Sequence, residues 1–283
     1  MKLMMFEKGT GAALGLVEGD AVVDLGAADA SLPKDLSGLI GAGARGLAAA
    51  KAAAGSAPAS ARLRLDAVKP ALPVAPAAKI VCVGLNYALH AKEGGHPIPT
   101  YPSFFLRVHS SLVPAGAPVI RPKASAQLDY ECELAIVIGK TGRHVPESEA
   151  LDHVFGYTLF NDVSVRDFQR KTSQWTPGKN FDATGPLGPC VVTADDLPAG
   201  ASGLRITTRV NGETMQDSNT SDMIFSTQRI VALLSVLLDA GVALTVIAIV
   251  AAIGGAMTGQ PQFALYLVLG ALAGVVVLRR GER

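Results

Sequence analysis

The sequence predicts an α+β fold that is mostly β. Apolar runs rich in β-branched and aromatic residues recur at 79–84, 129–139 and 155–160, and each ends at or just before a glycine or asparagine. Asn211-Gly212 separates two alternating segments, which is a strong hairpin signal. Helical patterns are few and short, so strands account for most of the expected structure.

The first 66 residues are expected to form a small β-rich domain. Short strand candidates with glycine-rich turns between them lie at 1–6, 12–17 and 21–24. An alanine-rich stretch at 44–54 favours a helix. Proline- and alanine-rich connectors then lead into a larger domain over 67–235, which ends in a helix predicted at 223–234 after Ser221-Asp222.

Two acidic residues occupy the strand predicted at 129–139. Alternation along an extended chain places Glu131 and Glu133 on one face and Cys132 on the other, and the apolar neighbours indicate that both faces are buried. Adjacent buried carboxylates require a shared proton, a basic partner or a hard divalent cation. An edge strand with two solvated glutamates is the competing interpretation.

Further polar side chains follow the neighbouring strands. Asp162 lies at the exit of the run at 155–160, and His90 and Glu93 lie three residues apart, on one face of a short helix after the run at 79–84. Gly94-Gly95 ends that helix and could hinge it. Taken singly, a histidine beside a glutamate is more often a surface pair. Together these residues suggest a divalent metal with a nearby base.

Four motifs carry a family resemblance. The chain resembles the fumarylacetoacetate hydrolase family at 84–90 (GLNYALH), 129–134 (DYECEL), 161–167 (NDVSVRD) and 178–189 (GKNFDATGPLGP), over roughly the first 235 residues. The resemblance implies a mixed β-roll or barrel catalytic domain and a homodimer. It also implies a metal site of Glu131, Glu133 and Asp162, normally for Mg²⁺ or Mn²⁺. All-oxygen ligands also admit Ca²⁺.

The resemblance assigns further roles. His90 with Glu93 resembles the family's water-activating dyad, Lys179 its active-site lysine, and Arg166 and Gln169 lie where members contact substrate. The implied reaction is hydrolysis of a C–C bond in an acylpyruvate or 2,4-diketo acid, such as fumarylpyruvate or fumarylacetoacetate, as in aromatic catabolism. Decarboxylation or isomerisation of a 2-oxo acid is the alternative within the family.

The tail at 236–283 departs from the family pattern. Two apolar runs, with no charge between Asp239 and Arg279, predict a transmembrane helical hairpin with membrane contact through 240–278. A truncated or chimaeric gene with an unrelated tail would give an impaired, membrane-associated product. A third reading makes these runs buried strands or helices of a soluble protein, because periodicity does not distinguish helix from strand here.

Composition narrows the functional class and the compartment. Lys+Arg 25 against Asp+Glu 24 gives a net charge of +1, so no electrostatic nucleic-acid binder is indicated. The three cysteines lie in or beside apolar runs without a CxxC spacing, which favours reduced core thiols in the cytoplasm. The N-terminus lacks the apolar region of a signal peptide. A cytoplasmic location is expected, with membrane association through the tail as the alternative.

Overall fold

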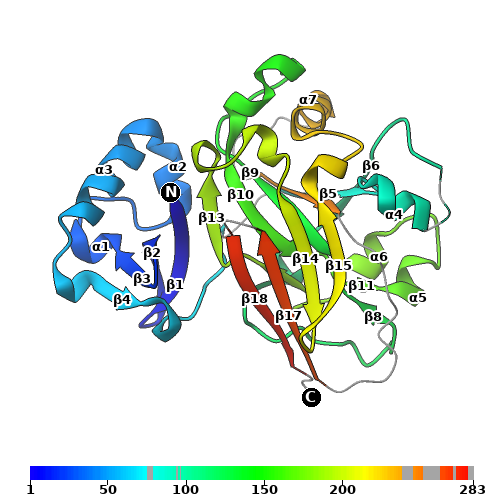
Figure 1. Cartoon of the computed structure of the whole chain (residues 1–283), viewed down its shortest axis with the longest axis horizontal. Helices are drawn as coiled ribbons and strands as arrows, with labels where there is room; N and C mark the ends of the chain where they lie inside the picture. Colours follow the sequence, from blue (N-terminus) through cyan, green and yellow to red (C-terminus); the bar gives the residue numbers. More distant parts are fainter. Residues whose placement is uncertain are drawn as a thin grey trace.

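A large mixed β-sheet runs through the chain (Figure 1). The computed structural model describes residues 1–74, 79–93, 95, 97–237, 245–250, 262–269 and 272–279. Within them the main sheet has twelve strands, and its continuous path has the order β4-β3-β2-β1-β13-β10-β9-β16-β5-β6. The predicted class, an α+β fold that is mostly β, is confirmed.

The N-terminal lobe contains the first four strands and three helices, on the left of Figure 1. The strands are β1 (Lys2–Lys8), β2 (Gly11–Glu18), β3 (Ala21–Asp24) and β4 (Arg62–Arg64). The helices are α1 (Leu25–Ala28), α2 (Leu36–Gly41) and α3 (Gly43–Gly55). The three predicted strands and the alanine-rich helix are therefore confirmed. Because β1 pairs with β13 (Cys190–Thr193), this sheet continues into the rest of the molecule, and the division at residue 66 stays a prediction.

The centre of the sheet consists of the strands that the sequence predicts. These are β5 (Lys79–Gly84), β9 (Cys132–Ile138) and β10 (Val154–Asn161), with β6 (Ser103–Arg107) at the edge beyond β5. Residues of β9 alternate between two hydrophobic clusters: Leu134 and Ile136 pack in one, and Ala135 and Val137 in the other. Both faces of β9 are therefore buried, as expected.

Shorter elements surround this centre. They are α4 (Ala88–Glu93), β7 (Leu112–Pro114), β8 (Leu128–Asp129), β11 (Ser164–Val165), α5 (Arg166–Gln169), α6 (Thr176–Lys179) and β12 (Gly185–Leu187). The expected hairpin is present as β14 (Arg205–Val210) and β15 (Glu213–Asn219), with Asn211 and Gly212 at positive φ in the turn.

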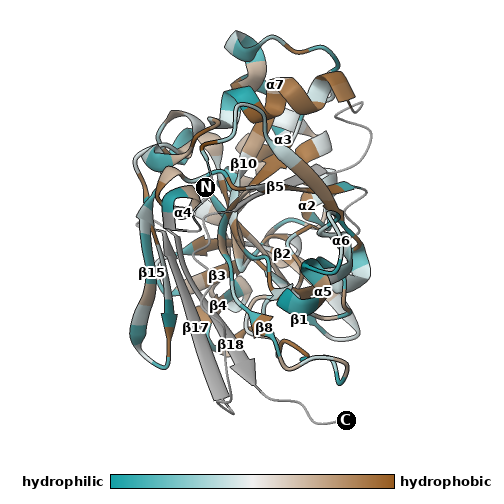
Figure 2. Cartoon of the chain, turned by 90° about the vertical axis from the view of Figure 1, so that its right-hand side faces the viewer, coloured by the Kyte–Doolittle hydropathy of each residue, from teal (hydrophilic) through white to brown (hydrophobic). Residues whose placement is uncertain are grey.

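The last predicted helix begins later than its capping pattern suggests. Helix α7 spans Thr227–Leu237, and Thr220–Asp222 forms a 3₁₀ turn because the Asn219 side chain accepts from Ser221 N. Figure 2 shows brown, apolar turns on α7, and Ile230, Val231 and Leu234 are buried.

The structure of the tail contradicts the predicted transmembrane helical hairpin. Strand β16 (Thr245–Val250) inserts between β5 and β9, parallel to the first and antiparallel to the second. Strands β17 (Gln262–Leu269) and β18 (Leu272–Arg279) form an antiparallel hairpin, and β17 pairs with β14. The helical hairpin is therefore wrong for these residues. The remaining tail positions, Arg280 included, lie outside the described residues.

The strand alternative explains the composition of the tail. Its β-branched, uncharged runs suit a position between two other strands as well as they suit a bilayer. To the domain predicted over 67–235 the tail adds β16 between β5 and β9 and β17 beside β14, and the boundary at 235 stays a prediction. Among the helices of the described residues, none has the length and apolar character of a membrane span.

A glycine on β10 tests the tight pairing of the central strands. A Cβ at Gly156 would lie 2.2 Å from the backbone oxygen of Val192, whereas a Cβ at Gly11 would meet nothing within 4 Å. We expect Gly156→Ala to lower the free energy of unfolding by about 2 kcal/mol or more, and Gly11→Ala to change it by less than about 0.5 kcal/mol. Thermal and denaturant unfolding would measure both. Equal effects of the two substitutions would contradict the pairing.

Candidate metal centre and active site

The ends of β9 and β10 hold two acidic residues side by side. The Asn161 side chain accepts a hydrogen bond from Glu131 N at 2.9 Å, and Asp162 N donates to Glu131 O at 2.9 Å. These bonds extend the antiparallel pairing of Asn161 with Cys132 by one step beyond the strands. Glu131 and Asp162 are 3% and 0% exposed, so the local backbone fixes two buried carboxylates next to each other.

Lys179 lies between these two carboxylates. Its Nζ is 2.6 Å from Asp162 Oδ2 and 2.8 Å from Glu131 Oε1, and it donates to Asp162 O at 3.0 Å. Lys179 ends the single helical turn α6. Burial would lower the pKa of Lys179, but the carboxylates of Asp162 and Glu131 raise it above its ordinary value. Lys179 is therefore a fixed positive charge.

Two arginines complete the charge pairing. Arg107, at the end of β6, is fully buried; it pairs with Asp162 Oδ1 and donates to Thr184 Oγ1 at 2.8 Å. Arg166 contacts Asp129 Oδ2 and Glu131 Oε1, each at 2.7 Å. Burial opposes the ionised form of Glu131, but Lys179 and Arg166 lower the pKa of this carboxyl group to about 2. Glu131 is therefore ionised.

Glu133 differs from its neighbours because it lacks a partner. It is 0% exposed, and neither of its carboxylate oxygens has a hydrogen-bond partner among the described residues. Burial and the nearby charge of Asp162 raise the pKa of Glu133 well above its usual value, against the opposing charge of Lys179. A buried carboxylate without a donor is costly unless it is protonated or binds a cation.

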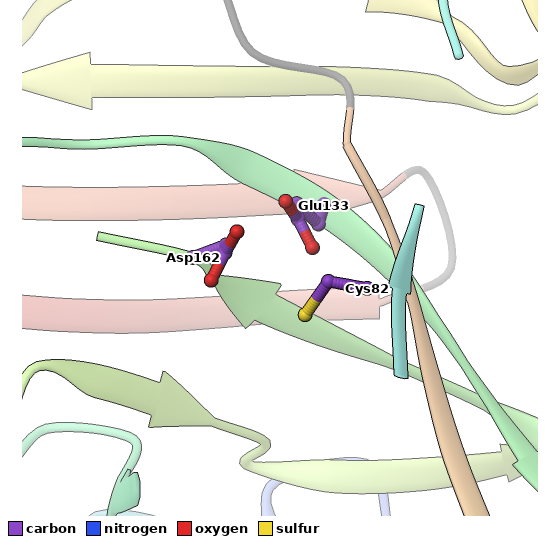
Figure 3. A group of neighbouring side chains, drawn as sticks. All are labelled: Cys82, Glu133 and Asp162. Atoms are coloured by element: carbon purple, nitrogen blue, oxygen red, sulfur yellow. The ribbon is translucent and has the colours of Figure 1, made fainter. Parts of the chain in front are cut away.

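Figure 3 shows where this carboxylate points. Glu133 on β9, Asp162 after β10 and Cys82 on β5 face one another, and one potential ligand atom from each lies within 4.8 Å of the others. The unpartnered oxygens of Glu133 beside Asp162 fit a divalent cation. Of the predicted ligands Glu131, Glu133 and Asp162, the last two belong to this group, whereas the Glu131 carboxylate contacts Lys179 and Arg166. Its assignment as a ligand remains a prediction.

The predicted base lies on α4. The side chains of His90 and Glu93 lie outside the described part of the structure, so their pairing stays a prediction. Two hydrogen bonds anchor Asn86, just before α4, to Phe225. Asn86 Nδ2 donates to Phe225 O at 3.0 Å, and Phe225 N donates to Asn86 Oδ1 at 2.8 Å. Gln169, predicted to contact substrate, accepts from Arg166 Nη1 at 2.9 Å.

Arg107 and Cys82 also lie at the centre, although the sequence alone does not place them there. Arg107 ends an apolar run, and alternation along β6 places it on the same buried face as Phe105, which is a detectable signal for a paired charge. Cys82 is expected to be a core thiol. It is buried, and burial together with Asp162 and Glu133 raises the pKa of its thiol well above the ordinary value, which favours the protonated thiol.

This mostly β fold is similar to the folds of solved enzymes, among them hydrolases and an isomerase. Residues 79–248 match the model of the fumarylacetoacetate (FAA) hydrolase C-terminal family. The chain belongs to the fumarylacetoacetate hydrolase family.

Individual relatives differ in their reactions. The mitochondrial oxaloacetate tautomerase FAHD2A of Homo sapiens is 40% identical over 242 residues, which cover 83% of this chain and 76% of that protein. Three solved structures each match 99–100% of this chain and 100% of their own. They are the fumarylacetoacetate hydrolase of Exiguobacterium antarcticum (31% identity, TM-score 0.81), the maleylpyruvate hydrolase of Sphingobium sp. SYK-6 in complex with manganese (II) ion and pyruvate (27%, 0.81) and the 5-carboxymethyl-2-hydroxymuconate delta-isomerase of Mycobacterium smegmatis (27%, 0.76).

Replacing Lys179 tests the charge pairing. We expect Lys179→Met to lower the free energy of unfolding by about 3–5 kcal/mol, because Glu131 and Asp162 would each lose a buried partner. Arg205→Met is the control: its pair with Asp217 is exposed, so the loss should not exceed about 1 kcal/mol. Denaturant titration measures both. A loss at Lys179 no larger than the control would show that the buried pairs are not required.

Metal binding tests the role of Glu133. Mn²⁺ at 100 times its dissociation constant should stabilise the native protein by about 2.7 kcal/mol, and EDTA should reverse the effect. Glu133→Gln should remain folded and lose most of this stabilisation, whereas Asp217→Asn at the surface should retain it. Differential scanning calorimetry with and without Mn²⁺ would check this. Full stabilisation of Glu133→Gln would place the ion elsewhere.

Proposed function

We propose that this chain is a divalent-metal-dependent enzyme that interconverts the keto and enol forms of a small 2-oxo diacid, with oxaloacetate as the first candidate. The observation that carries the proposal is the unpartnered carboxylate of Glu133 beside Asp162 and the fixed ammonium of Lys179. This arrangement suits a centre that binds a cation and an anionic oxygen together. The oxaloacetate tautomerase relative, at 40% identity, supports the choice of reaction.

The residues of the centre would have different roles in the reaction. Glu133 and Asp162, with Glu131 beside them, would hold Mg²⁺ or Mn²⁺, with Ca²⁺ as an oxygen-binding alternative. The ion, when bound, supplies Lewis-acid stabilisation for the enolate form of a 2-oxo acid. Lys179 is too strongly held as an ammonium to remove a proton, and its three N–H groups face Asp162 Oδ2, Asp162 O and Glu131 Oε1. Its role is to orient these carboxylates and to supply positive charge near a substrate oxygen that gains negative charge.

Tautomerisation needs one proton to leave carbon and one to reach oxygen. We assign the removal of the C3 proton of oxaloacetate to His90 on α4, and the C2 oxygen then gains a proton, so the reaction has no net change in composition. Arg166 Nη1 donates to Gln169 Oε1 at 2.9 Å, and these two side chains are proposed to orient a substrate carboxylate. Glu93 would polarise His90.

A second candidate is hydrolytic cleavage of an acylpyruvate, the reaction that the resemblance first suggests. The pair of His90 and Glu93 that the sequence predicts would favour it, because hydrolysis needs an activated water molecule whereas tautomerisation does not. The structural similarity to a maleylpyruvate hydrolase in complex with manganese (II) ion and pyruvate is consistent with it. In that reaction His90 would take a proton from water, and the resulting hydroxide would add to the acyl carbonyl. The C–C bond would then break, and the carbon of the departing enolate would receive the proton.

One set of assays separates the reactions. The purified chain with Mn²⁺ would be mixed with enol oxaloacetate, and the ultraviolet absorbance of the enol and the release of pyruvate would be followed against a metal-only blank. Loss of enol above the blank without pyruvate indicates tautomerase, and pyruvate from oxaloacetate indicates decarboxylase. Pyruvate from fumarylpyruvate indicates hydrolase. No metal-dependent turnover of either substrate would contradict the proposal.

Replacing His90 tests the base. His90→Ala should lower kcat by roughly 10²–10⁴-fold, because a general base is lost, and should leave Mn²⁺ binding unchanged. His109→Ala is the matched control, since His109 is exposed after β6 and is not assigned to the reaction. Initial rates and calorimetric titration of Mn²⁺ measure the two properties. Full activity of His90→Ala would move the base to another residue.

A further inference from the structure

Cys82 is placed in the metal centre by the backbone of the central sheet. On β5, Ile80 and Cys82 pack on the same side as Ala135 and Val137 of β9, while Val81 and Val83 pack on the other side. Since Glu133 alternates in step with Ala135, it shares that side. The register brings the strands together, because Ala248 of β16 pairs with Ala135 on one side and with Cys82 on the other.

A second observation makes this thiol part of a site. Both Glu133 oxygens are buried and without a hydrogen-bond partner among the described residues, and Figure 3 shows the carboxylate in the space that Cys82 and Asp162 also face. The sulfur and two carboxylate oxygens lie within 4.8 Å of one another, close enough for small side-chain rotations to bring them onto one ion.

We propose that Cys82 is a soft third ligand, through which the centre binds thiophilic divalent ions such as Zn²⁺, Cd²⁺ and Co²⁺ in competition with Mg²⁺ and Mn²⁺. The hard ions take oxygen ligands and leave the thiol protonated, whereas zinc and cadmium favour thiolate. On binding, the S–H bond breaks, the metal–sulfur bond forms and the proton passes to solvent; no oxidation is involved. The inference shares Glu133 and Asp162 with the proposed function but does not depend on the reaction.

The consequence is a centre with two classes of occupant. A tightly held soft ion would occupy the ligand positions of Glu133 and Asp162. The turnover supported by Mn²⁺ would then stop until a chelator removed the soft ion. Cys132 offers a comparison within the same chain. It is also fully buried, but it lies on the opposite side of β9 and its thiol donates to Thr207 O at 3.7 Å.

The test uses cobalt as a spectroscopic probe. The full-length protein would be titrated with Co²⁺, and the near-ultraviolet sulfur-to-metal charge-transfer band recorded for the wild type, Cys82→Ser, Cys82→Ala and the control Cys132→Ser. We expect the band in the wild type and in Cys132→Ser and its loss in both Cys82 variants. Cd²⁺ affinity of the Cys82 variants should fall by at least about tenfold, while Mn²⁺ affinity should change by less than about threefold.

The outcomes separate this inference from the proposed function. A wild-type cobalt complex without the band, no Co²⁺ binding at all, or a band that persists in Cys82→Ser would overturn the inference. If Mn²⁺-dependent turnover is present in that case, the proposed function stands alone. If the band depends on Cys82 but no 2-oxo acid is turned over, the inference stands and the proposed function fails. A wild-type cobalt complex without the band overturns the inference even where a variant does not fold.

Discussion

The balance of buried charge at the ends of β9 and β10 determines what this centre can do. Four carboxylates and three cations meet there, with little access to solvent: Asp129, Glu131, Glu133 and Asp162 against Arg107, Arg166 and Lys179. Every cation is paired, and Glu133 is the carboxylate left over. A proton or a metal cation can compensate it, and Asp162, although paired with Arg107 and Lys179, is near enough to offer the ion a second carboxylate.

The backbone builds this balance from distant parts of the sequence. Asn161 and Asp162 bond to Glu131 across the antiparallel pair, α6 delivers Lys179 and the edge strand β6 delivers Arg107. Strand β16, from the tail, sits between β9 and β5 and sets the distance at which Cys82 meets Glu133. Strand β16 is therefore part of the framework of the centre, and substitutions in it are expected to shift Cys82 relative to Glu133.

Much of the site could be predicted from the sequence, and the physical reasons for the rest are specific. The acidic residues of 129–139 stand out because a charge on a buried strand needs compensation, and the motif resemblance adds Lys179 and Arg166. Arg107 and Cys82 were not assigned to the site because each lies in a strand whose neighbours in space are far away in sequence. The helical reading of the tail failed because runs of Val, Ile and Ala have no periodicity that separates a buried strand from a membrane helix.

The position of a bound ion tests the central claim most directly. Crystals of the protein grown with Mn²⁺ would be measured at a wavelength where manganese scatters anomalously. The charge balance predicts one strong anomalous peak at about 2.0–2.2 Å from carboxylate oxygens of both Glu133 and Asp162. A peak at another site, or a manganese-free centre in which Glu133 is a protonated carboxyl group hydrogen-bonded to a neighbour, would contradict it.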